Sequence, residues 1–216
     1  MIISILGFIR SGSHGRSRGG FLPRVIWYIT RAFHNALFHV NKKQKVYEYE
    51  SLTYIFDKLS VHDVVTWNAL ISGYVQYGHH EEALGCFELM QCKGTPAPDV
   101  VTYICVLKSC SSLRACHKGQ EIHADISKEQ SIEKDLFVGN ALMDMYFKCG
   151  LIMKAQEVFD QIIVRDVVTW NVLISGYAQL GYNEEAMSFF EVMKQRRDVS
   201  PNEVTYVCVL KACSNL

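Results

Sequence analysis

The sequence predicts an all-α fold, a solenoid of stacked antiparallel helix hairpins. Residues 63–84 return as residues 166–187 with 16 of 22 positions identical, and residues 100–113 return as residues 203–216 with 10 of 14 identical. Both copies lie 103 residues apart, and a fixed offset shared by two segments is typical of a repeat architecture. A period of 103 residues is too long for one supersecondary unit, so smaller units must lie within it.

The spacing of a few side chains divides the period into units. Residues 68, 70, 74 and 78 are spaced like residues 140, 142, 146 and 150, and the two sets share the pattern Asn, Leu, Tyr, Gly. Counting from one extended segment to the next gives the units 64–99, 100–135, 136–166 and 167–202, with lengths of 36, 36, 31 and 36 residues. A decayed unit precedes them at 35–63, and residues 203–216 begin a fifth unit.

Each unit has the pattern of two helices. In the unit 64–99 the first helix is predicted by an apolar stripe at helical spacing, formed by Trp67, Leu70, Ile71 and Tyr74. Gly78 follows it as a C-cap, and the second helix has its own stripe of Ala83, Phe87 and Met90. One such hairpin cannot bury its apolar face alone, so neighbouring hairpins must stack.

The charge is unevenly distributed along the chain. Residues 1–47 hold eight Lys or Arg and no acidic residue, and the remaining 14 Lys and Arg face 22 Asp and Glu, so the repeat region carries a formal charge of −8. The basic segment 1–34, which contains Ser and Arg, is similar to an organellar transit peptide. A divergent repeat fused to a disordered head is the alternative interpretation. The stretch MIISILGFI before Arg10 is only nine residues long, which is too short to span a membrane.

The eight cysteines show no CxxC spacing. Cys105 and Cys110 recur 103 residues later as Cys208 and Cys213, within the first-helix stripes. Free cysteines commonly act as small buried hydrophobic residues. We therefore expect free thiols in a reducing compartment rather than a disulfide framework.

The stretch VVTWNALISGYVQYGHHEEALGCFELM at 64–90 resembles the pentatricopeptide repeat family. The unit lengths are similar to those of its plant subclass, which implies a degenerate S-type unit at 35–63, P-type units at 64–99 and 167–202, L-type units at 100–135 and, truncated, at 203–216, and an S-type unit at 136–166. The resemblance also implies a right-handed superhelix. Because residue 216 falls after the first helix of a unit, we interpret the chain as a shortened form or a fragment without a deaminase domain.

The resemblance implies a non-enzymatic protein that recognises organellar single-stranded RNA, one base per repeat. Such proteins of mitochondria or chloroplasts select sites for RNA modification such as C-to-U editing, or for processing and splicing. The partner is then the RNA, with an editing or processing enzyme supplied in trans. No cofactor, metal or membrane is implied.

The family's base-reading residues are the fifth and the last residue of a repeat. At matching positions these are three pairs: Asn68 with Asp99, Asn140 with Asp166, and Asn171 with Asn202. By resemblance, Asn with Asp favours uracil, and Asn with Asn favours pyrimidines, cytosine above uracil. The second residues, which sandwich the bases, are Val65, Val101, Phe137 and Val168.

Two neighbouring units depart from this pattern. The fifth residue of the L-type unit is Ile104, so Asp135 stands alone. The decayed unit offers Asn35 with Asp63, in an uncertain register. All the Asp and Asn residues that end a unit also directly precede a helix, where they are favoured as N-caps for reasons unrelated to RNA.

Three other functions compete with RNA binding. His79-His80-Glu81 contains the His-x-Glu triplet of zinc deaminases but lacks the Pro-Cys-x-x-Cys element that completes the metal site. Cys110, Cys116, His117 and His123 have residue types that suit zinc, although buried cysteines and surface histidines explain them better. A solenoid that binds a peptide or a protein partner is the main alternative, and the acidic repeat region supports it because phosphate binding favours Lys and Arg.

Overall fold

The structure is a computed structural model that describes residues 53–59, 61–94 and 96–214. The chain divides into two units, Met1–Lys45 and Val46–Leu216. The first unit lies outside the described residues, and with it the predicted basic segment 1–34 and Asn35. All regular structure in the described residues is helical.

The helices of the second unit alternate between first and second members of a hairpin. The first members are α4 (Val64–Tyr77), α6 (Val100–Leu113), α9 (Leu136–Lys148), α11 (Val167–Gln179) and α13 (Glu203–Cys213). The second members are α5 (His80–Lys93), α7 (Cys116–Ile126), α10 (Ile152–Gln161) and α12 (Asn183–Gln195). A short helix that the sequence did not predict, α8 (Gln130–Glu133), lies between α7 and α9, and residues 53–58 are also helical.

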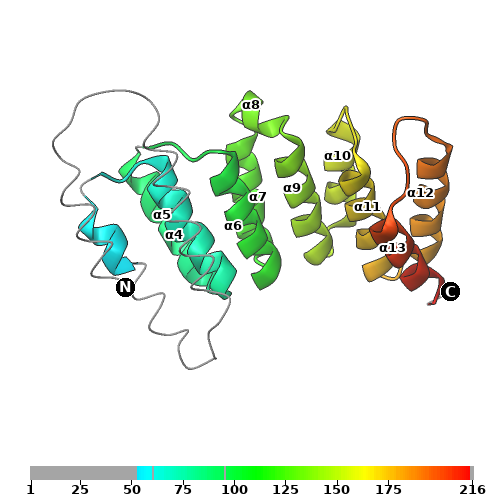
Figure 1. Cartoon of the computed structure of the whole chain (residues 1–216), viewed down its shortest axis with the longest axis horizontal. Coiled ribbons are helices and arrows are strands. Elements are labelled where there is room, and N and C mark those ends of the chain that lie inside the picture. Colours follow the sequence, from blue (N-terminus) through cyan, green and yellow to red (C-terminus); the bar gives the residue numbers. More distant parts are fainter. Residues whose placement is uncertain (1–52, 60, 95, 215–216) are drawn as a thin grey trace. The chain divides into compact units, whose positions relative to one another are not determined.

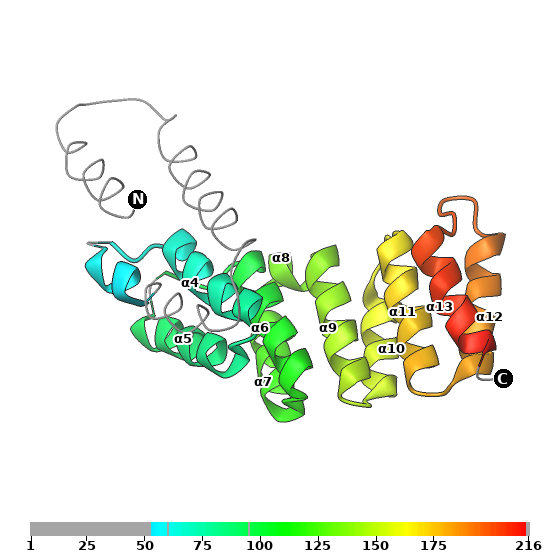
Figure 2. The same cartoon turned by 60° about the horizontal axis from the view of Figure 1, so that its bottom comes forward.

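The hairpins stack in chain order, as Figures 1 and 2 show. Successive first helices contact one another, and each second helix packs against the first helix of its own hairpin. All the substantial contacts between labelled helices join the same hairpin or its neighbour in sequence. The predicted fold class, a solenoid of stacked antiparallel hairpins, is confirmed.

Polar caps and glycines set the limits of the helices. Every first helix from α4 to α13 starts after an Asp or Asn whose side chain accepts a hydrogen bond from a backbone amide of the first turn. Gly78 ends α4 at φ 81°, in the left-handed region where glycine has no steric penalty. Each first helix therefore begins at a fixed residue, and the side chains of its first turn take equivalent positions from repeat to repeat.

The core follows the predicted stripes. Trp67, Leu70, Ile71 and Tyr74 of α4 are buried, as are Ala83, Phe87 and Met90 of α5. Phe56, from the helical residues 53–58, packs edge to face on Trp67 with ring centroids 4.6 Å apart. None of the helices in the described ranges combines the length and apolarity needed to cross a membrane.

The expected burial of the repeated cysteines is only partly correct. All eight cysteines are free, and Cys110 is buried, but its counterpart Cys213 is exposed. The reason is that Cys110 lies on α6, which α7 and α9 cover, whereas only α11 and α12 have substantial contacts with α13 in the described part of the chain.

Candidate nucleic-acid interface

One face of the first helices carries the predicted contact residues. Positions 2, 5, 9 and 13 of a helix lie on one side because they are three or four residues apart. The predicted base-sandwiching residues occupy position 2, and all of them are exposed: Val65 at 36%, Val101 and Val168 at 50%, and Phe137 at 67%. Val204 takes the same place on α13 and is 54% exposed. A row of apolar side chains thus faces solvent beside the caps.

The first reading pair is joined by hydrogen bonds across two repeats. Asn68 Nδ2 donates to Asp99 Oδ1 over 2.9 Å. Thr102, in the first turn of α6, donates its hydroxyl to Asn68 Oδ1 over 2.5 Å, and its backbone amide donates to Asp99 Oδ1 over 2.9 Å. The three side chains form one network at the junction of α4 and α6.

The same network recurs at the junction of α11 and α13. Asn171 Nδ2 donates to Asn202 Oδ1 over 3.1 Å, and the Thr205 hydroxyl donates to Asn171 Oδ1 over 2.6 Å. The backbone amide of Thr205 donates to Asn202 Oδ1 over 3.1 Å. The two networks differ only in the cap residue, which is Asp99 in one and Asn202 in the other.

The third predicted pair is not joined. Asp166 accepts from the backbone amide and the hydroxyl of Thr169, both over 2.9 Å. Asn140 is 8% exposed, and its Oδ1 is buried without a hydrogen-bond partner in the described part of the chain. The structure therefore brings together two of the three predicted pairs and leaves Asn140 apart from Asp166.

Asp135 has no asparagine to pair with, as expected because the fifth residue of its repeat is the apolar Ile104. It caps α9 by accepting from the backbone amides of Phe137 and Val138, over 2.9 and 3.1 Å. Ile104 offers no polar atom to join it. The L-type junction thus presents an exposed apolar side chain, Phe137, but the preceding repeat has the apolar Ile104 in place of an asparagine at its fifth position.

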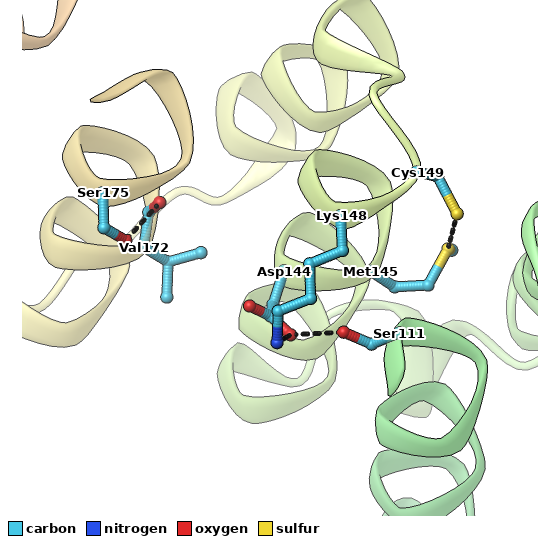
Figure 3. A network of polar contacts seen from close by, with 7 residues as sticks. All are labelled: Ser111, Asp144, Met145, Lys148, Cys149, Val172 and Ser175. Atoms are coloured by element: carbon cyan, nitrogen blue, oxygen red, sulfur yellow. Dashed lines mark hydrogen bonds and ion pairs between the residues drawn. The ribbon is translucent and has the colours of Figure 1, made fainter. Parts of the chain in front are cut away.

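At positions 9 and 13 of the first helices, the same face carries charged and hydroxyl side chains. Asp144, at position 9 of α9, accepts from the Ser111 hydroxyl over 2.7 Å and from Lys148 Nζ over 3.0 Å (Figure 3). On α11, the Ser175 hydroxyl donates instead to the Val172 carbonyl over 3.2 Å (Figure 3). Lys108 and Lys211 take position 9 of α6 and α13 and are exposed. Although the region is acidic overall, this face includes cations.

Comparison with known protein families agrees with the geometry. A model described as the PPR repeat family matches residues 62–112 and 165–215, and a model described as the PPR repeat matches residues 140–167. The chain belongs to the pentatricopeptide repeat family.

Several Arabidopsis thaliana pentatricopeptide repeat-containing proteins are similar to the chain. The chloroplastic protein DOT4 is 39% identical over 161 residues, which cover 74% of this chain and 18% of DOT4. A mitochondrial relative is 40% identical over 171 residues, which cover 79% of this chain and 26% of the relative. The chain spans about a quarter or less of these relatives.

Solved structures with the same fold include those of pentatricopeptide repeat protein PPR10. PPR10 in complex with an 18-nucleotide psaJ RNA element superposes with a TM-score of 0.64 at 23% identity, covering 76% of this chain and 24% of PPR10. A structure of PPR10 from maize has a TM-score of 0.59 at 20% identity, covering 84% of this chain and 28% of PPR10. At these identities the similarity establishes the fold.

The residue types that suit zinc have other partners in this pentatricopeptide repeat array. His117 is exposed and lies 3.3 Å from Glu121, whereas His123 Nδ1 hydrogen-bonds the Tyr146 hydroxyl at 2.6 Å. Burial lowers the pKa of His123, and nearby Lys154 lowers it further. Within the described ranges, no three His, Cys, Asp or Glu side chains are grouped so as to hold a metal ion.

The two bridging threonines were missed by sequence reasoning. The signal was present, because a Thr follows the capping Asp or Asn by three residues at 66, 102, 169 and 205. Such a spacing is commonly a capping motif of a single helix. The sequence did not show that two of these threonines, Thr102 and Thr205, also bond the preceding repeat.

Proposed function

We propose that this chain binds single-stranded RNA selectively, with one base per repeat. The observation that carries the proposal is the pair of joined networks, Asn68 with Asp99 and Asn171 with Asn202, each next to an exposed valine at position 2. An exposed apolar side chain offers a surface for the face of a base, and a polar pair beside it can bond the base edge.

The atoms left over in each network match different pyrimidines. Asn68 uses one Nδ2 hydrogen on Asp99 and keeps one, while the bonds of the network to the Asp99 carboxylate all reach Oδ1 and leave Oδ2 as an acceptor. This donor and acceptor fit a carbonyl oxygen and the N3–H of uracil. Asn202 has an amide nitrogen in place of Oδ2, so its junction offers two donors, which fit O2 and the unprotonated N3 of cytosine.

We assign the reading to the repeats 64–99, 136–166 and 167–202, with the L-type repeat 100–135 between them. In the family's polarity the N-terminal repeat takes the 5′ base. The expected order from 5′ to 3′ is uracil, any base, uracil, then a pyrimidine. Val65, Val101, Phe137 and Val168 then sandwich the successive bases.

The biological role that we propose is that of a recognition factor in organellar RNA metabolism. The similar proteins include chloroplastic and mitochondrial members, in agreement with the predicted organellar location. The chain's own chemistry is binding, so an editing or processing enzyme acts in trans on the RNA that the repeats select.

A titration against an RNA panel tests the proposal. Filter binding or fluorescence at fixed salt measures Kd for RNAs varied one base at a time. Replacing Asn68 by Ala should reduce discrimination at the first step by about tenfold, the contribution of a good polar base contact, and leave the other steps unchanged. An equal loss of affinity for every base at that step would show that Asn68 positions the chain without reading.

Binding of a peptide or a protein partner is the second candidate. The formal charge of −8 beyond residue 47 and the exposed apolar row at position 2 favour it. The same panel separates the two functions. If the full chain binds none of the RNAs better than an unrelated control RNA, the protein-interaction function replaces RNA binding.

A further inference from the structure

The junctions between repeats fall into two classes that differ in the backbone of the cap. Asp99 and Asn202 have φ angles of −112° and −115°, whereas Asp63 and Asp166 have −83° and −87°. Proline precedes the cap only in the first class, as Pro98 and Pro201. Among the helices of the described residues, a complete capping box is also found only in that class.

The capping box determines where the threonine hydroxyl points. At Asp99 the backbone amide donates to Thr102 Oγ1 over 3.2 Å, and at Asn202 it donates to Thr205 Oγ1 over 3.0 Å. A hydroxyl has only one hydrogen. In both cases the shortest acceptor contact is the carbonyl oxygen of the asparagine in the preceding repeat, at 2.5 and 2.6 Å.

Thr169 occupies the same position at the Asp166 junction and behaves differently. It is as fully buried as Thr102 and Thr205. Its hydroxyl donates to Asp166 Oδ1 over 2.9 Å, and Asn140 Oδ1 remains without a partner in the described ranges. The hydrogen bond between asparagine and cap is present at both junctions where the threonine reaches back and is absent from this one.

We propose that Thr102 and Thr205 are positioning residues that set base specificity for the repeat preceding their own. Each holds the carbonyl of the reading asparagine, so that the amide nitrogen faces both the cap and the base. We call this hydrogen bond the threonine bridge. The inference rests on the proposed RNA-binding function and deepens it, because it makes the readout depend on a third residue.

The threonine bridge implies that the repeats discriminate between uracil and cytosine to different degrees. At Asn68 and Asn171 the amide cannot rotate without placing its oxygen against the cap oxygen and giving up the threonine hydrogen bond. At Asn140 neither bond holds the amide, so it can present an oxygen or a nitrogen to the base. The Asn140 step should therefore discriminate uracil from cytosine less than the Asn68 step, although both caps are Asp.

The decisive variants are Thr102→Val and Thr169→Val in the full chain. Both remove a hydroxyl from a buried threonine in the first turn of a helix, but only Thr102→Val removes a threonine bridge. We expect Thr102→Val to lower the uracil-to-cytosine ratio of Kd values at the Asn68 step by about tenfold, a typical value for one polar base contact. Thr102→Ser keeps the hydroxyl and should restore the ratio.

Thr169→Val should change the ratio at the Asn140 step by less than about twofold, because no bridge is lost there. Thermal unfolding should show a larger decrease in Tm for Thr102→Val than for Thr169→Val, because the Thr102 hydroxyl accepts one hydrogen bond and donates another, whereas the Thr169 hydroxyl donates one. A side-chain amide NMR spectrum gives a readout without RNA. The Asn68 signals should shift in Thr102→Val, whereas the Asn140 signals should stay in place in Thr169→Val.

The outcomes separate the inference from the function on which it rests. If the parent discriminates bases but Thr102→Val discriminates equally well, the threonine bridge has no role in specificity and the inference fails alone. If Thr102→Ser behaves like Thr102→Val, the hydroxyl does not restore the ratio, and the inference also fails. If the parent shows no base preference at any step, the proposed function fails and the inference fails with it.

Discussion

Burial, more than neighbouring charge, sets the pKa values of the Cys86 and Cys110 thiols. Burial raises the pKa of Cys86 and of Cys110 to about 11, so little thiolate forms at neutral pH. Cys92 and Cys213 are exposed. A thiol must ionise to react as a nucleophile, and it must also be reached by the reagent. Reactivity should therefore differ strongly among side chains of the same type.

We predict that an alkylating reagent at pH 8 labels Cys92 and Cys213 first and Cys86 and Cys110 last. Peptide mapping by mass spectrometry after increasing reaction times measures the order. Labelling in guanidinium chloride is the control, because unfolding removes the burial and should make the four rates similar. Native Cys110 reacting as fast as native Cys92 would contradict the prediction.

At the scale of helices, α9 and α11 approach each other closely through a glycine. A Cβ atom added to Gly176 would lie 2.3 Å from two ring atoms of Phe147, whose ring is buried. A Cβ added to Gly85 of α5 would meet nothing within 4 Å. Both glycines lie inside helices, so alanine should improve the helix propensity at either position. Only at Gly176 does the added methyl group also meet a packed side chain.

We predict opposite effects for these two substitutions. Gly176→Ala should lower the free energy of unfolding by about 1–3 kcal/mol, the usual cost of overpacking a core. Gly85→Ala should raise it by about 0.5–1 kcal/mol, because alanine is the better helix former. Urea denaturation measures both. An equal stabilisation by the two alanines would show that Phe147 moves aside freely.

The hairpin helices could be predicted from the sequence, whereas the differences in hydrogen bonding between the repeat junctions could not. The stripe from Trp67 to Tyr74 and the recurring caps identified the first helices, because periodicity and capping are local properties. The short helix Gln130–Glu133 has too few residues for a periodic signal. Asn140 and Asp166 lie 26 residues apart in the sequence, whereas the two joined pairs lie 31 residues apart, so the missing hydrogen bond coincides with the shorter unit.

The resemblance likewise predicted the asparagine and cap pairs that would read bases, but it did not predict which pairs are joined by hydrogen bonds or that a threonine takes part. Asp99 and Asp166 are the same residue after the same fifth-position asparagine, yet only Asp99 bonds it. The difference lies in the cap backbone and in the direction of one hydroxyl. Such features need three-dimensional coordinates, since Thr102 and Thr169 are identical in type and burial.

At the scale of the molecule, stacking between neighbouring hairpins holds the described repeats together. The core residues of each hairpin are covered by the next one, as expected when a solenoid grows by nearest-neighbour contacts. Cys110 belongs to this core, whereas His117 is exposed. We therefore expect packing, rather than a metal ion, to account for these residue types.

We predict that Cys110, Cys116, His117 and His123 hold no structural zinc. Elemental analysis of protein purified without added metal should find zinc far below one equivalent, and a chelator should leave the helical circular dichroism unchanged. Structural zinc sites contribute directly to folding, so their removal unfolds the domain. Near-stoichiometric zinc, with loss of helix on chelation, would contradict the prediction.

The threonine bridge has a consequence for how such arrays can be copied. Asn68, Asp99 and Thr102 return as Asn171, Asn202 and Thr205, each 103 residues later. A duplication of that length carries asparagine, cap and threonine together, although they belong to two successive repeats. Copying a single repeat would separate them. The one change among the three, Asp99 to Asn202, exchanges an acceptor for a donor. On the proposed function, a duplicated junction can therefore change its base preference and keep the hydrogen bonds that position the asparagine.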